Sequence, residues 1–183
     1  MDSRKKICVF LSSREVSPED CEATYNFGVL LSKNGFDLVF GGAGVPGMMR
    51  ELARGIHEHG GDSTSIIPTC FDWGTTDGEP GTAIETADMA ERKRTMMEMS
   101  GAFVVLKGGL GTLDELLEVW TIKALDGHKK PILIYATPAY KAALIQLFQV
   151  MVEEKTVDQD QWEALEWCHS YDDIIQSLKS TFS

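Results

Sequence analysis

Residues 106–115 read Leu-Lys-Gly-Gly-Leu-Gly-Thr-Leu-Asp-Glu. This stretch and the residues on either side of it indicate the fold class. An apolar run at residues 102–106 leads into it, and apolar side chains recur at helical spacing from Leu113 to Ala124. The pattern predicts a strand, a glycine turn and a helix. Three glycines in four positions let the backbone approach a ligand closely and reach positive φ. The first amides of such a helix favour an anion such as phosphate.

The same stretch also has an explanation that needs no ligand. Thr112 and Glu115 have the spacing of a capping box, S/T-x-x-E, and glycines at a strand-to-helix turn can serve packing alone. The stretch matches neither the dinucleotide pattern G-x-G-x-x-G nor the phosphate loop G-x-x-x-x-G-K-[ST], because no lysine follows the last glycine. Taken alone, this turn is explained equally well as a phosphate-binding site and as a purely structural turn.

A second strand, glycine turn and helix come earlier in the chain. Residues 38–40 form a short apolar strand that runs into a glycine-rich turn at residues 41–47, followed by a helix expected from Met48 to His59. Two glycine-rich loops at strand ends in one small domain are harder to explain by packing alone than a single loop is. His57 and His59 lie two residues apart and do not share a helix face, so a metal site is not expected there.

The N-terminal strand places two hydroxyl groups where a ligand can reach them. The continuous apolar run at residues 7–11 is typical of a strand buried on both faces of a parallel sheet. Ser12 and Ser13 follow at its carboxyl end, the end at which open α/β sheets bind ligands. They can hold a phosphate or simply cap a turn, and position alone leaves both open.

Strands and helices alternate along the whole chain. Further helices are expected from Ser17 to Asn34, from Asp88 to Ser100, at residues 138–155 and at residues 170–179. Further strands are expected at residues 63–67, 83–86 and 131–135. Residues 158–168 are ambiguous, and residues 69–82 form a loop too long for a simple connector, either a substrate lid or a disordered segment. The alternation predicts one domain over residues 1–183, an α/β Rossmann-like, doubly wound parallel sheet with helices on both faces.

The helix that begins at Asp88 carries three basic residues within its first two turns, where they oppose the helix dipole. Arg92 lies three residues after Met89 and four before Met96, so it shares their inner face. This placement favours a nearby anion or carboxylate over a basic side chain that lies along the surface. For Arg94 the surface explanation is favoured.

Composition narrows the classes of partner and cofactor. With 183 residues and a net charge of −11, the chain suits one domain that binds neither nucleic acid nor an anionic membrane nonspecifically. Its four cysteines form no C-x-x-C pair, which argues against a zinc or redox motif. The five-residue apolar run near the N-terminus is too short for a signal peptide or membrane span. A cytoplasmic protein is therefore expected.

Two motifs together resemble those of a known family. Residues 108–115 resemble the P-G-G-x-G-T-x-x-E motif of the LOG (lonely guy) family of cytokinin riboside 5′-monophosphate phosphoribohydrolases, often mislabelled as lysine decarboxylases. Residues 89–93 are similar to its M-x-x-R-K motif, and residues 41–49 are similar to its G-G-G-x-x-G-L-M segment. The match covers about residues 6–155. Lys107 departs from the family, since it stands where the motif usually has proline.

The resemblance implies hydrolysis of the N-glycosidic bond of a nucleoside 5′-monophosphate, AMP or N6-modified AMP, to a free base and ribose 5-phosphate. It implies Arg92 and Glu115 as the catalytic pair, with Glu115 beside the oxocarbenium-like ribosyl centre and the phosphate on the glycine turn. It implies no metal and no cofactor. The implied substrate-binding residues are Ser12, Ser13, Gly42, Met89, Lys93, Gly108, Gly109, Leu110, Gly111, Thr112 and Thr121.

The resemblance further implies a homodimer, for which Met96, Met97, Met99 and Trp120 are candidate surface residues unless they belong to the core. Two other functions stay open: a non-catalytic carrier of a phosphorylated ligand such as molybdenum cofactor, and a pyrimidine nucleotide N-glycosidase. The presence of both Arg92 and Glu115 favours the enzyme. Lysine decarboxylation is not expected, because nothing marks a lysine that binds pyridoxal phosphate.

Overall fold

The structure is a computed structural model that describes residues 4–14, 16–42, 46–71 and 80–183. Its strands are β1 (Lys5–Phe10), β2 (Phe36–Phe40), β3 (Ser63–Pro68), β4 (Thr82–Thr86), β5 (Ala102–Val105), β6 (Ile132–Ile134) and β7 (Leu165–Trp167). Its helices are α1 (Pro18–Lys33), α2 (Met48–His57), α3 (Met89–Met99), α4 (Leu110–Ala124), α5 (Pro138–Glu153), α6 (Gln159–Glu163) and α7 (Tyr171–Phe182).

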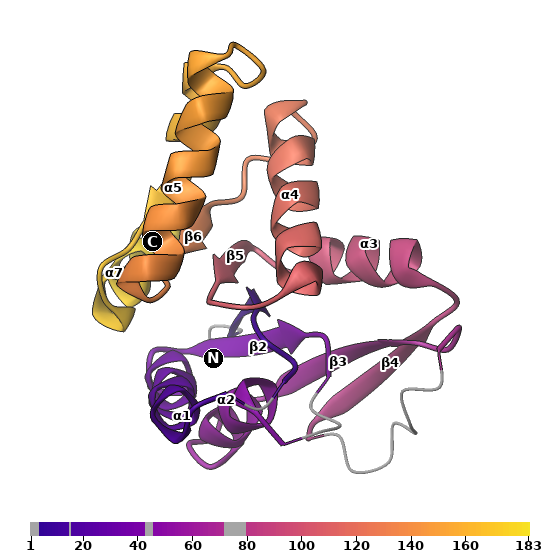
Figure 1. The fold of residues 1–183 in the computed structure, drawn as a ribbon. Helices are drawn as coiled ribbons and strands as arrows, with labels where there is room; N and C mark the ends of the chain where they lie inside the picture. Colours follow the sequence, from indigo (N-terminus) through magenta and orange to yellow (C-terminus); the bar gives the residue numbers. More distant parts are fainter. Residues whose placement is uncertain (1–3, 15, 43–45, 72–79) are drawn as a thin grey trace.

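All seven strands join one parallel sheet in the order β4-β3-β2-β1-β5-β6-β7 (Figure 1). The side chains of β1 alternate between two cores, as the pleat requires. Ile7 and Val9 pack with α1, α2 and α7 on one face, whereas Cys8 and Phe10 pack with α3, α4 and α5 on the other. The α/β class and the doubly wound parallel sheet are therefore confirmed.

The order of the strands indicates where a ligand is expected. The chain proceeds from β1 outward through β2, β3 and β4, and then returns to place β5 on the other side of β1. In open α/β sheets, ligands bind outside the carboxyl ends of the strands where the order reverses. Here those ends lead to Ser12 and to the glycine turn. The two loops touch, because the Ser12 amide donates to the Lys107 carbonyl oxygen at 3.2 Å.

Both edges of the sheet hold strands that the local sequence indicates weakly. Residues 83–86, expected only as a short extended piece, belong to β4, which pairs with β3 in parallel register. The ambiguous segment at residues 158–168 divides into α6 and the three-residue β7, which pairs with β6. A strand this short lies below the length at which alternation can be recognised. The central part of the expected loop, residues 72–79, lies outside the described residues.

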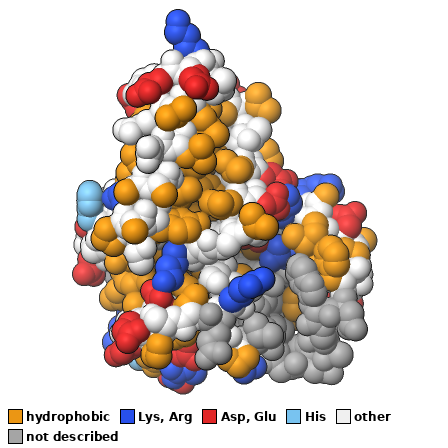
Figure 2. Space-filling model, viewed as in Figure 1, with side chains coloured by type: hydrophobic (Ala, Val, Ile, Leu, Met, Phe, Trp, Pro, Cys, Tyr) orange, Lys and Arg blue, Asp and Glu red, His pale blue; other side chains and the backbone are white. Residues whose placement is uncertain are grey.

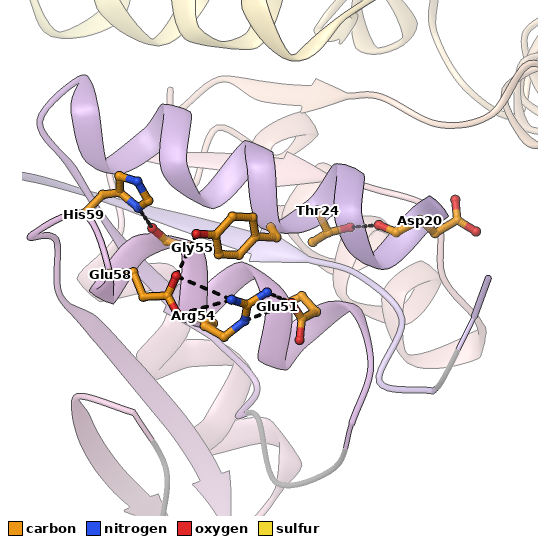
Figure 3. Close-up of polar contacts among 8 residues, drawn as sticks. Asp20, Thr24, Glu51, Arg54, Gly55, Glu58 and His59 are labelled. Carbon is orange, nitrogen blue, oxygen red and sulfur yellow. Dashed lines mark hydrogen bonds and ion pairs between the residues drawn. The ribbon is translucent and has the colours of Figure 1, made fainter. Parts of the chain in front are cut away.

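Helices α1 and α2 pack against each other through two glycines. A Cβ at Gly28 would lie 2.3 Å from the Leu52 carbonyl oxygen, and one at Gly55 would lie 2.2 Å from the Tyr25 carbonyl oxygen. Arg54 closes the edge of this contact, with its guanidinium carbon 4.1 Å from the centre of the Tyr25 ring. Figure 3 shows the Arg54 guanidinium between Glu51 and Glu58, with which it forms ion pairs of 2.5 and 3.1 Å.

The described residues contain neither a cluster of metal-ligating side chains nor a helix that could span a membrane. In residues 4–14, 16–42, 46–71 and 80–183, no three His, Cys, Asp or Glu side chains gather closely enough to hold a metal ion. Over the same ranges, no helix combines the length and the apolar character needed to cross a bilayer.

Candidate active site

A buried ion pair joins α3 to α4. The Arg92 Nη1 donates to the Glu115 Oε1 at 2.9 Å, and the two side chains are only 6% and 5% exposed. The Arg92 Nε also donates to the carbonyl oxygen of Ile66 near the end of β3, at 3.0 Å. Arg92 therefore lies on the inner side of α3 with Met96 and beside a carboxylate, as the spacing of the helix predicts.

Burial dominates the electrostatics of this pair. It raises the pKa of the Glu115 carboxyl above its usual value, and the nearby Arg92 guanidinium opposes that rise. Burial also raises the pKa of the Cys8 thiol well above its usual value, and the Glu115 charge adds to the effect. Two ions removed from water stabilise a fold only weakly, even when they are well paired. A buried carboxyl with a raised pKa at the carboxyl edge of the sheet is thus a candidate for function.

Gly41, directly after β2, leaves room for the arginine. A Cβ at this position would lie 2.0 Å from the Arg92 Nη2, so any larger residue would displace the guanidinium. The next residue, Gly42, has a φ of 102°, a conformation that favours glycine. The first glycine of this second turn therefore positions Arg92, a role that the sequence did not suggest. Residues 43–45 of the turn lie outside the described residues.

The start of α4 differs from the expected capping box. Its N-cap is Gly109, with a φ of −98°, and no side chain caps the helix. Thr112 lies inside the first turn, where its Oγ1 occupies the space that a Cβ at Gly108 would take, at 1.9 Å. Glu115 bonds Arg92 instead of the first amides of the helix. The capping-box interpretation was wrong, because Gly109 and not Thr112 is the N-cap and Glu115 pairs with Arg92.

Packing within the chain explains Gly108 but not Gly109 or Gly111. Positive φ is absent at Gly108, Gly109 and Gly111, which corrects the expectation that the turn needs it. Apart from the adjoining residues and the backbone of α4 itself, no described atom lies within 4 Å of a Cβ built at Gly109 or Gly111. Neither backbone conformation nor packing therefore requires glycine at these two positions. The amides at the start of α4 have no side-chain cap, and amides of this kind can accept an anion.

The structure brings the serine pair to this turn. The Ser12 backbone bonds Lys107, while the Ser12 Oγ accepts from the Arg14 amide at 3.1 Å in a local turn. Ser13 is exposed beside it, and Leu110 is 88% exposed at the tip of α4. Both loops therefore present groups to the same solvent-filled edge.

The remaining candidates lie farther from the glycine turn. Lys93 forms an ion pair with Asp114 at 3.0 Å and another with Glu118, so it ties α3 to α4. Met89 is half-buried at the first position of α3. Thr121 is exposed nine residues beyond Thr112, which corresponds to about 14 Å along the helix axis. Within one chain, Thr121 is therefore not brought together with the others.

Two contacts of the turn had no signal in the sequence. Tyr140, from α5, donates its hydroxyl to the Gly108 carbonyl oxygen at 3.0 Å. Lys107, which replaces the usual proline, forms an ion pair with Asp20 of α1. Both partners are distant in sequence, so no local pattern could indicate them.

Of the two explanations left open for the candidate dimer residues, the structure supports core packing. Met96 and Trp120 are buried in the core between the sheet and α3, α4 and α5, and are 1% and 6% exposed. Met97 and Met99 are partly buried against the same core. Their apolar character is thus explained by packing within one chain.

Comparison with known proteins gives a consistent family. The sequence model described as "Possible lysine decarboxylase" matches residues 49–178. The phosphoribohydrolase LOG7 of Arabidopsis thaliana, which acts on cytokinin riboside 5′-monophosphate, is 36% identical over 152 residues, 82% of this chain and 70% of that protein. The enzyme LOG3 of the same plant, named for the same activity, is 31% identical over 177 residues, 96% and 82% of the two chains.

Solved structures resemble the whole chain. The molybdenum cofactor binding protein of Rippkaea orientalis aligns over 100% of both chains with a TM-score of 0.74 and 22% identity. The molybdenum cofactor carrier protein of Chlamydomonas reinhardtii aligns over 98% of both chains with a TM-score of 0.71 and 18% identity. At such low identity the likeness establishes the fold alone.

Proposed function

This chain belongs to the LOG family of phosphoribohydrolases, and we infer from that membership and from the Arg92–Glu115 pair that it is a hydrolase of nucleoside 5′-monophosphates. It cleaves the N-glycosidic bond and releases a free base and ribose 5-phosphate. The observation that carries the inference is the proximity of a buried carboxylate to an anion site with open glycines. Glu115 follows Gly111 by about one helical turn, or about 6 Å of rise, a spacing suited to a ribose 5-phosphate.

The 5′-phosphate binds at the start of α4. The backbone amides of residues 109–112 and the hydroxyl of Thr112 donate to its oxygens, and Ser12 and Ser13 add donors from the end of β1. The missing side chains at Gly109 and Gly111 let the phosphate approach the amides closely. Because the protein carries a net charge of −11, these local donors must supply the whole attraction.

Glu115 acts at the anomeric carbon. As the bond to the base breaks, its electron pair leaves with the base and positive charge develops on the ribosyl ring. A carboxylate beside that charge stabilises it and accepts a proton from the attacking water, and a proton passes to the departing base, which is released neutral. Arg92 holds this carboxylate in place at 2.9 Å, and the carboxylate retains lone pairs for substrate or water.

A chromatographic assay tests this function. Purified protein is incubated separately with AMP, N6-isopentenyl-AMP, CMP and adenosine, and the free base is measured. We expect release from a purine monophosphate but not from adenosine, and a loss of about 10²–10⁴-fold in kcat for Glu115→Gln. The matched control is Glu98→Gln, which removes an exposed carboxylate from α3 and should leave kcat unchanged.

Other results of this assay would identify the alternatives. Release of cytosine alone would identify a pyrimidine nucleotide N-glycosidase. Tight binding of a phosphorylated ligand without release of any base would support a carrier. Equal release by the wild type and by Glu115→Gln would remove Glu115 from the mechanism.

We also propose that the chain forms a homodimer through α4 and α5. Leu117 and Leu125 on α4 are 42% and 76% exposed, and Leu147 and Val150 on α5 are 51% and 41% exposed. Figure 2 shows apolar side chains gathered on the upper part of the molecule, where α4 and α5 lie. Large exposed apolar patches are typical of contact surfaces. Thr121 lies between Leu117 and Leu125 on the same helical face and would be part of this interface.

Sedimentation at micromolar protein concentration tests the dimer. We expect a dimer for the wild type and a monomer for the double variant Leu117→Glu/Leu125→Glu. A monomeric wild type would contradict the proposal.

We further propose that residues 1–183 form one nucleotide-binding domain and that the protein is cytoplasmic. In that compartment the unpaired cysteines would stay reduced; they are Cys8, Cys21, Cys70 and Cys168.

A further inference from the structure

A second cavity lies at the carboxyl edge of the sheet, away from the Arg92–Glu115 pair. It has a volume of about 410 Å³ and is bordered by the segments that follow β5, β6 and β7 and by the first turns of α1, α5 and α7. In Figure 1 the lower end of α5 and helix α7 lie above α1. This volume falls in the range of small-molecule sites.

The cavity lies on the opposite face of the sheet from the candidate active site. Its wall includes Met48, Tyr135 and Tyr171, which pack with the core beneath α1, α2 and α7. Glu115 instead lies among Phe10 and Val119 of the other core. Lys107 adjoins the glycine turn, but the cavity wall does not include Arg92, Glu115 or the glycines of that turn, so a ligand in the cavity would lie apart from Glu115.

The charge inside the cavity is positive. Its wall carries two lysines, Lys107 and Lys141, against one carboxylate, Asp20, which is bonded to Lys107. Lys141 donates only to the Cys168 carbonyl oxygen, at 3.2 Å, and no carboxylate of the described residues lies within ion-pair distance of it. Burial raises the pKa of Tyr171 to about 12, so this wall residue is neutral at pH 7.

The rest of the wall suits a flat apolar group. The rings of Tyr135 and Tyr171 lie with their centres 4.7 Å apart and form one side, with Met48 and Leu106 nearby. The first turn of α5 faces the cavity through Pro138 and Lys141, and its N-cap residue makes no side-chain bond to the helix amides. A positive end and an aromatic side within one cavity predict a ligand that has an anionic group at one end and a flat apolar group at the other.

We propose that this cavity is a second binding site, which takes a small organic anion with a flat apolar body and a carboxylate or phosphate group held by Lys141 and Lys107. The site does not depend on the phosphoribohydrolase activity.

Calorimetric titration of the full chain tests the proposal with three probes. Phenyl phosphate and benzoate carry the two candidate anionic groups on one flat ring, and benzyl alcohol is the neutral control. We expect both anions to bind and benzyl alcohol to bind at least about tenfold more weakly. The tighter of the two anions identifies whether the natural ligand is a phosphate ester or a carboxylate.

Four variants place the binding. Lys141→Met removes the charge at similar length and should weaken anion binding about tenfold, while Ala23→Leu fills the cavity and should abolish it. Lys179→Met changes an exposed lysine elsewhere, and Thr112→Val changes the glycine turn; neither should alter the affinity. Circular dichroism spectra confirm that each variant is folded.

Three results would overturn the proposal. The first is that neither anion binds the wild type at millimolar concentration. The second is that benzyl alcohol binds as tightly as the anions do. The third is that Thr112→Val abolishes binding whereas Lys141→Met and Ala23→Leu leave it unchanged, which would place the anion at the glycine turn instead.

Discussion

Two pairs of glycines in this molecule serve opposite purposes. At the contact between α1 and α2, a Cβ on Gly28 or Gly55 would overlap a carbonyl oxygen of the neighbouring helix. At the start of α4, a Cβ on Gly109 or Gly111 would meet no described atom within 4 Å apart from the adjoining residues and the backbone of α4 itself. The first pair is required by the chain's own packing. The second pair leaves open space beside the helix, which in the proposed function the phosphate of the substrate occupies.

The same two regions also differ in the exposure of the arginine that each contains. Arg54 and its two carboxylates lie at the surface, where the arginine side chain is 48% exposed and Glu58 47%. Arg92 and Glu115 are about 5% exposed. An exposed ion pair contributes little and depends on salt, whereas a buried one is costly to desolvate and is retained for a reason other than stability. The buried pair lies beside the open glycines.

The largest expected effect is on the packing glycines. Gly55→Ala would place a methyl group 2.2 Å from the Tyr25 carbonyl oxygen, so α1 and α2 must separate. We expect the free energy of unfolding in urea to fall by about 2–3 kcal/mol. A loss below about 0.5 kcal/mol would mean that the helices adjust without cost and that the close contact is not required.

The open glycines should respond in the opposite way. Gly111→Ala adds a methyl group to the first turn of α4 where there is room, so stability should stay the same or rise by about 0.5–1 kcal/mol. The methyl group would obstruct the phosphate, and we expect KM for the monophosphate to rise about tenfold or more. Urea unfolding and initial-rate kinetics on one preparation give both values. An unchanged KM would separate Gly111 from the ligand.

The buried carboxylate should produce a pH-dependent stability. Because burial raises the folded-state pKa of Glu115, the folded protein holds this proton more tightly than the unfolded chain does. Its stabilisation is complete below the unfolded pKa and is lost as pH rises through the folded pKa. The stability of the wild type relative to Glu115→Gln should therefore fall from about pH 4.5 toward neutrality, by at most about 1.4 kcal/mol per pH unit.

Urea unfolding of both proteins across that pH range measures this difference. A relative stability that rises with pH would instead mean that Arg92 outweighs burial and lowers the pKa of Glu115.

The smallest effect is expected at the surface. Arg54→Met removes two exposed ion pairs and should lower the free energy of unfolding by less than about 1 kcal/mol, and by less still in high salt. Arg94→Met is the matched control, since Arg94 is exposed and forms no ion pair in the described part of the chain. A salt-independent loss at Arg54 would indicate that its packing on Tyr25 matters more than its charge.

The sequence by itself determined the alternation of strands and helices, the starts of α1 and α3, and the inner position of Arg92. These features depend on residues within one or two helical turns, and the periods of helices and strands record them directly. Ser17 and Asp88 cap their helices as their positions predict.

Only the tertiary structure decided what each conspicuous residue contacts. Arg92 pairs with Glu115, which lies 23 residues away in the sequence, and the guanidinium occupies the space beside Gly41. Thr112 and Glu115 do not form the expected capping box. The tertiary structure also added β4 and β7 to the edges of the sheet and placed Met96 in the core. These outcomes depend on segments that meet only in space, and a local pattern holds no information about a partner that lies far along the chain.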